Sequence, residues 1–310
     1  MKKDLSPRFL VVCSVISHST NFFSYTFLNA QLLLVTNNNL LILAIYNLIL
    51  YSCIFVTFFA VSFLVEKVNR VWLYRISIII KCVMLFTIML FSGNISNNYI
   101  LFAILIGISD GTFYVSSHNL ESETVNTKTS PKFHTYLMVF NNITSILLPI
   151  ALGSSIDFIG FKETALIIFI LGIIQIVFSF FIKSKFNKAG KMQMFQFFKI
   201  IKKDKFKNLR LIYLNCLFQG LLTSVSLSVT VLIMLEYSSN FSLGYLKTIF
   251  TSLTIICLII YNLLKNKVKS IIILISGILP IIATVGLMFG INLTTIIIFS
   301  VCNTVFYAIL

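Results

Sequence analysis

The chain has 310 residues, of which 58% are hydrophobic and only 11% are charged. Soluble domains have about 25% charged residues, so this composition excludes an ordinary water-soluble fold and predicts that lipid covers most of the surface. The net charge of +15 does not indicate nucleic-acid binding, because the basic residues lie between apolar runs and not on one soluble face.

Ten apolar segments are long enough to cross about 30 Å of hydrocarbon as helices. In chain order, they are residues 9–32, 40–64, 73–92, 99–118, 136–155, 163–182, 209–235, 244–264, 270–289 and 294–310. These spans predict an all-α fold, a polytopic transmembrane helical bundle.

The longest polar interval divides the predicted spans into two groups. The expected parts are an N-terminal six-helix bundle (1–182), a cytoplasmic basic amphipathic linker (183–208) on the anionic lipid surface, and a C-terminal bundle of four spans (209–310). A six-plus-six architecture would have twelve spans, so we expect the sequence to stop before its last two helices. A protein of ten spans is the alternative.

The distribution of basic residues predicts the orientation in the membrane. If the N-terminus is cytoplasmic, 21 of the 24 Lys and Arg residues fall on the cytoplasmic side, as the positive-inside rule requires. The abundance of Asn, Ile, Lys and Phe is typical of bacteria with AT-rich genomes. We therefore expect a multi-pass protein of a bacterial plasma membrane.

Polar side chains recur at helical spacing on the first, fourth, seventh and tenth predicted spans. They include His18, Asn21 and Tyr25 on the first span, Asp110 and Tyr114 on the fourth, Asn215 and Gln219 on the seventh, and Asn303 and Tyr307 on the tenth. This pattern predicts that the four helices line a central aqueous cavity through which a substrate or protons pass. The alternative is that these groups bond between packed helices and have no transport role.

Two formal charges lie deep within predicted spans. Lys81 on the third span and Asp110 on the fourth have similar calculated depths, and an unpaired charge there would cost several kcal/mol. We therefore predict an ion pair, in which a proton could neutralise Asp110 during transport. His18, at a similar depth, is the expected second titrating group, because imidazole titrates near neutrality. The alternatives are a purely structural pair and a core histidine.

The segment between the second and third spans carries a family resemblance. It reads Ser62-Phe-Leu-Val-Glu66-Lys67-Val-Asn69-Arg70 and resembles the signature of the major facilitator superfamily, with Ser62 and Asn69 in place of its glycines. The resemblance implies that Glu66, Lys67 and Arg70 form a gating motif on the cytoplasmic side.

The fifth span is similar to the antiporter motif of the same superfamily at two positions, Pro149 and Gly153, which the resemblance makes a helix-packing motif. The family resemblance as a whole implies two six-helix bundles that rock about a midplane site. It indicates a secondary-active transporter that moves a small solute by alternating access, and proton-coupled efflux is one form that this transport could take. We expect a monomer in the lipid bilayer, without a cofactor.

Two other functions compete with transport. One is a degenerate, non-transporting protein of the same fold. The other is a membrane enzyme acting on lipid, for which the sequence offers His118, Glu121, Glu123 and His134 in and beside the loop after the fourth span. Their spacing is not a recognised metal pattern, so we predict neither a metal site nor a catalytic residue.

Overall fold

The computed structural model describes residues 6–65, 67–125, 130–183, 239–263, 278–279, 281–283, 285–286 and 293–309. Every regular element in these ranges is helical. The chain divides into two compact units, which are described separately below. The first comprises Met1–Gly190 and Ser239–Gly244, and the second comprises Lys191–Ser238 and Tyr245–Leu310.

The first predicted span is formed by three helical elements in succession. These are α1 (Ser6–Phe22), the π turn η1 (Phe23–Phe27) and α2 (Leu28–Val35). A π turn holds one residue more than an α-helical turn and is frequent at functional sites. Side-chain bonds to the backbone surround it, since Ser24 Oγ donates to the Thr20 carbonyl and Asn29 Nδ2 to the Tyr25 carbonyl.

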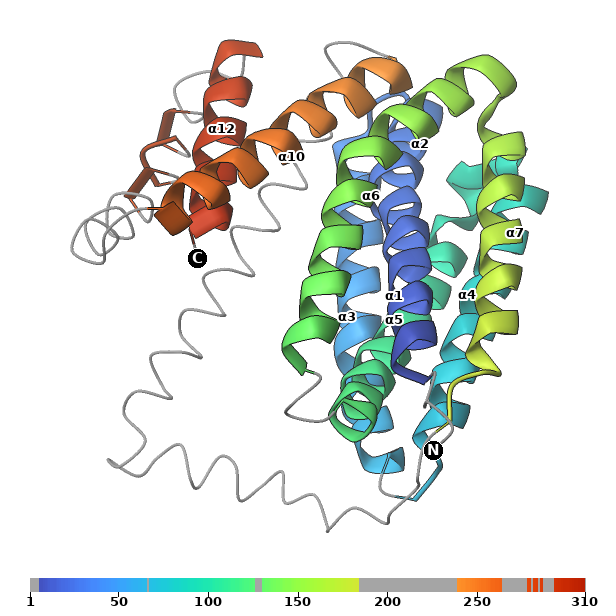
Figure 1. The fold of residues 1–310 in the computed structure, drawn as a ribbon. Helices are drawn as coiled ribbons and strands as arrows, with labels where there is room; N and C mark the ends of the chain where they lie inside the picture. Colours follow the sequence, from blue (N-terminus) through green and yellow to red (C-terminus); the bar gives the residue numbers. More distant parts are fainter. Residues whose placement is uncertain are drawn as a thin grey trace, which may run out of the picture. The chain divides into compact units, whose positions relative to one another are not determined.

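Five further helices of the first unit follow (Figure 1). They are α3 (Leu40–Leu64), α4 (Arg70–Leu90), α5 (Ile95–Thr124), α6 (Ser130–Ile159) and α7 (Phe161–Ser179), with the short 3-10 turn η2 (Ser92–Asn94) before α5. Asparagine begins two of them: Asn39 caps α3 by accepting from Leu41 N and Ile42 N, and Asn69 caps α4 by accepting from Val71 N. These caps determine the residue at which each helix begins.

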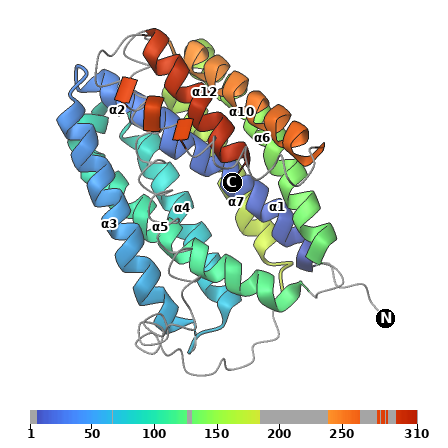
Figure 2. The same ribbon diagram turned by 90° about the vertical axis from the view of Figure 1, so that its left-hand side faces the viewer.

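Helix α5 is the most buried of the described helices that are long enough to cross a membrane. It packs against α3 on one side and α4 on the other, as Figure 2 shows, and α4 in turn packs against α7. The contact with α3 is a backbone approach: a Cβ at Gly107 would lie 2.4 Å from Cys53 Cβ, and one at Gly111 would lie 2.8 Å from the Ile54 carbonyl oxygen. Small residues four positions apart allow this spacing between membrane helices.

Six of the described helices are long and apolar enough to cross a membrane, and each coincides with a predicted span. The sixth is α10 (Asn240–Leu263), whose first residues belong to the first unit. The second unit contains the rest of α10 and α12 (Leu293–Ile309). The seventh predicted span lies outside the described residues, as does most of the ninth. The count of ten spans and the six-plus-six architecture therefore stay predictions.

Candidate functional site

A buried ion pair occupies the interior of the first unit. Lys81 on α4 and Asp110 on α5 are 2% and 0% exposed, and Lys81 Nζ lies 2.8 Å from Asp110 Oδ1. The ion pair predicted from the depths of the two residues is thus confirmed. Each charge neutralises the other in a region where an unpaired charge would be strongly unfavourable.

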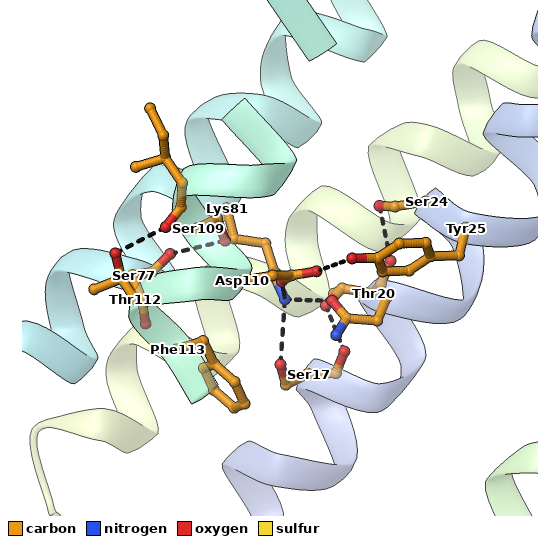
Figure 3. A network of polar contacts seen from close by, with 12 residues as sticks. Ser17, Thr20, Ser24, Tyr25, Ser77, Lys81, Ser109, Asp110, Thr112 and Phe113 are labelled. Atoms are coloured by element: carbon orange, nitrogen blue, oxygen red, sulfur yellow. Dashed lines mark hydrogen bonds and ion pairs between the residues drawn. The ribbon is translucent and has the colours of Figure 1, made fainter. Parts of the chain in front are cut away.

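The first span supplies the remaining polar partners of this pair (Figure 3). Lys81 Nζ donates to Ser17 Oγ at 3.3 Å and to Asn21 Oδ1, both on α1. The Tyr25 hydroxyl in the π turn donates to Asp110 Oδ2 at 2.7 Å. The two oxygens of the carboxylate therefore have different partners, an ammonium group and a phenol. Three helical segments meet at a single pair of charges.

A side-chain hydrogen bond next to the pair joins α4 to α5. Ser109 Oγ donates to the Ser77 carbonyl oxygen at 3.3 Å, and both residues are fully buried. Ser77 precedes Lys81 by one helical turn, and Ser109 directly precedes Asp110. The bond between the two serines therefore joins α4 to α5 within about one helical turn of both charges.

The other predicted pathway residues lie in several places. His18 Nε2 lies 2.8 Å from Ser145 Oγ on α6, and Tyr114 is 38% exposed one turn after Asp110. On α12, Asn303 is buried, and its side-chain amide has no hydrogen-bond partner among the residues that the structure describes. Asn215, Gln219 and the side chain of Tyr307 lie outside the described part of the chain.

The residues of the predicted gating motif have different environments. Arg70 begins α4, is buried, and donates through Nη1 to Glu123 Oε1 near the end of α5. Lys67 is exposed, and Glu66 lies outside the described residues. Asn69, which stands where the signature has a glycine, caps α4 with an ordinary negative φ of −61°, so this turn does not need glycine.

Glu123 is a partner that sequence reasoning missed. We expected His118, Glu121 and Glu123 to lie in and beside a loop, but α5 continues to Thr124 and carries all three. His118 Nδ1 lies 3.7 Å from Glu121 Oε2, which leaves Glu123 to pair with Arg70. In the described part of the chain, no three His, Cys, Asp or Glu side chains are close enough to bind a metal.

Pro149 and Gly153 lie in α6 beside the first turn of α10. A Cβ at Gly153 would lie 2.4 Å from the Asn240 carbonyl oxygen, and one at Gly244 would lie 2.2 Å from the Pro149 carbonyl oxygen. One turn further along α6, Asp157 accepts hydrogen bonds from three groups at the start of α10. These are Ser239 Oγ at 3.1 Å, Asn240 Nδ2 at 3.0 Å and Phe241 N at 2.8 Å.

Comparison with known proteins identifies the family. The sequence model of the Major Facilitator Superfamily matches residues 9–310, which is nearly the whole chain. The chain belongs to the major facilitator superfamily. The helical fold of the described residues agrees with this membership.

Two further relatives of this major facilitator protein are distant. The uncharacterized protein YqgE of Bacillus subtilis (strain 168) is 22% identical over 274 residues, which cover 86% of this chain and 63% of YqgE. A bacterial homologue of the iron transporter ferroportin, solved in an inward-facing state, superposes with a TM-score of 0.67 at 12% identity. That match covers 100% of this chain and 81% of the homologue. At this identity, the likeness shows a shared fold only.

The ion pair between Arg70 and Glu123 yields a first prediction for this major facilitator protein. Because both side chains are mostly buried, removing one partner leaves the other charge without its counterion. Arg70→Gln and Glu123→Gln are each expected to lower stability by about 1–3 kcal/mol, and the double variant to lose less than the sum. Thermal unfolding in detergent measures this coupling. Lys67→Gln, at an exposed position, is the control, and strictly additive losses would show that the pair contributes nothing.

Proposed function

We propose that this chain is a secondary-active transporter that moves a small solute across a membrane by alternating access, with protons as the coupling ion. The observation that carries the proposal is the buried Lys81–Asp110 pair, covered by the polar face of the first span, in a major facilitator protein. Ionisable residues inside membrane spans are rare and mark substrate or ion pathways.

The geometry of the pair suits a change of state. Asn21 and Tyr25 are half-buried, whereas the charges that they contact are almost fully buried. Both contacts come from the first span, so a shift of that helix against α4 and α5 would break them together. A purely structural ion pair would not require these contacts with the first span, because Lys81 and Asp110 already neutralise each other.

Proton coupling follows from the same arrangement. A proton added to Asp110 removes the negative charge, and a proton lost from Lys81 removes the positive charge. Either change abolishes the attraction that joins α4 to α5 at this point. His18, close to Ser145 on α6, is the proposed second site of proton exchange, on the same face of the first span.

We assign gating roles to contacts outside the buried pair. The Arg70–Glu123 ion pair joins the beginning of α4 to the end of α5, at the predicted cytoplasmic end, and Glu66 and Lys67 precede Arg70 in the sequence. The proposed cycle opens and closes this end while the buried pair binds or releases a proton. The proposed location is a bacterial plasma membrane with the N-terminus in the cytoplasm, and efflux is the proposed direction.

Everted membrane vesicles that contain the protein provide the test. After respiration acidifies the vesicle lumen, which a quenched acridine dye reports, ethidium and a panel of small amines are added one at a time. We expect at least one compound to release protons and restore fluorescence. Asp110→Asn should abolish that response, and His18→Gln should weaken it, because the coupling path is interrupted.

Glu163→Gln is the matched control for the vesicle experiment, since it removes a carboxylate charge at an exposed position on α7. Proton coupling through this site would be wrong if both Asp110→Asn and His18→Gln behaved like the parent protein. A parent protein that responds to no compound, although it is folded and inserted, would instead favour a non-transporting relative of the superfamily.

A further inference from the structure

The ammonium group of Lys81 lies among oxygen atoms of three other side chains. Nζ forms an ion pair with one of these oxygens and donates hydrogen bonds to the other two. In that order, the three oxygens are Asp110 Oδ1, Ser17 Oγ and Asn21 Oδ1. The Phe113 ring completes the enclosure, with its centroid 5.2 Å from Nζ (Figure 3). We call these four residues the ammonium cage.

We propose that the ammonium cage is a binding site for a solute of the primary-ammonium class, and that the side chain of Lys81 occupies it in place of the solute in this state. The incoming ammonium group displaces that of Lys81 and takes over its bonds. This inference names the substrate class of the transporter proposed above, and it rests on that proposed function. Binding itself can be tested without transport.

The chemistry of the cage selects among cations. Three oxygens match the three N–H donors of an ammonium group, whereas magnesium requires six near-octahedral ligands and calcium six to eight. An aromatic face favours an organic cation over a strongly hydrated ion. A quaternary ammonium ion has no N–H group to offer the three oxygens. An anion would meet the carboxylate of Asp110.

Charge balance couples this exchange to a proton. If Lys81 left the cage as an ammonium ion, two cations would share one buried carboxylate, which is strongly unfavourable. Lys81 therefore leaves as a neutral amine, and its proton passes to water: R–NH3⁺ enters and one H⁺ leaves. The net charge of the site does not change, so the exchange is electroneutral.

Other titratable side chains lie near the pair. Tyr25 from the π turn bonds to the carboxylate, and Cys82 follows Lys81 on α4. Tyr46 and Tyr51 on α3 and Tyr114 on α5 lie within electrostatic range of Asp110. Phenols and thiols are neutral at pH 7 unless activated. Lys81 is the donor of the released proton in this scheme, because its ammonium group is the one that loses its counterion to the incoming cation.

Calorimetric titration of the purified chain in detergent tests the inference. Methylammonium is titrated at pH 7.5 in two buffers with different ionisation enthalpies, which gives the number of protons released for each molecule bound. We expect about one proton from the parent protein. Lys81→Met removes the tethered competitor, so methylammonium should bind about tenfold or more tightly and release no proton. Lys81→Met/Asp110→Asn should not bind it.

Two controls and two contrary results complete the test. Tetramethylammonium should not bind the parent protein or Lys81→Met, and Asn21→Ala should weaken methylammonium binding to the parent protein. The cage would be refuted if the parent protein bound methylammonium without releasing a proton, or did not bind it at all. Should Lys81→Met fail to fold, the proton count of the parent protein still decides. Methylammonium binding with proton release, but no transport in vesicles, would uphold the cage and overturn the transport function.

Discussion

Lys81→Met is expected to destabilise the protein by about 3–5 kcal/mol at neutral pH, because it leaves the Asp110 carboxylate buried without a counterion. Asp110→Asn is expected to be damaging for the opposite reason, since it leaves the Lys81 ammonium group with neutral acceptors only. Thermal unfolding of the purified protein in detergent, without added amines, measures both effects as a fall in Tm. Asp110 is fully buried, so solvent does little to screen the charge that each single variant leaves unpaired.

The double variant Lys81→Met/Asp110→Asn makes this prediction specific. It removes both charges, and replacing a buried ion pair by neutral groups of similar volume is often nearly neutral in stability. Its Tm should therefore lie well above the Tm of either single variant. Equal Tm values for the single and double variants would show that packing of the two side chains, and not their charge, determines the stability.

Gly107→Ala is expected to lower stability by about 1–3 kcal/mol, and Gly107→Val by more, because α3 and α5 touch at this glycine. The new Cβ would lie 2.4 Å from Cys53 Cβ and 2.8 Å from the Leu50 carbonyl oxygen. Side-chain rotation cannot relieve a contact with backbone, so the helices must separate. The loss is measured as a fall in Tm in detergent.

Gly93→Ala is the matched control for Gly107→Ala, because a Cβ at Gly93 meets nothing within 4 Å. Adding Cys53→Gly to Gly107→Ala removes the shorter contact and leaves the one with Leu50, so it should restore stability in part. If Gly93→Ala and Gly107→Ala had the same small effect, the close packing of α3 on α5 would be wrong.

Much of the first unit could be predicted from the sequence because each helix is long and apolar. Span 40–64, for example, coincides with α3 (Leu40–Leu64). The Lys81–Asp110 pair could also be predicted, since depth along a helix follows from a constant rise per residue. Ser17 could not be identified as a partner, because the helical rotation that brings it to Lys81 depends on packing against α4.

Sequence reasoning missed two features, a packing motif and an ion-pair partner, for different reasons. The pair Gly107 and Gly111 is a small-residue motif within an apolar segment, and its four-residue spacing was visible in the sequence as a packing signal. Glu123 was placed near a loop because helix ends follow from polar composition only approximately. The partner of Arg70 then depended on six further residues of helix beyond the predicted end at 118.

The π turn of the first span makes the length of that helix as important as its composition. Because the π turn holds one residue more than an α-helical turn, deleting Phe23 or Ser24 would replace it by an ordinary α-helical turn and change the angle between the side chains on either side. Asn21 and Tyr25 lie on either side of the point where such a deletion would act, and they could no longer face Lys81 and Asp110 together. Substitutions along this span would change one contact each, whereas a single-residue deletion would expose both charges at once.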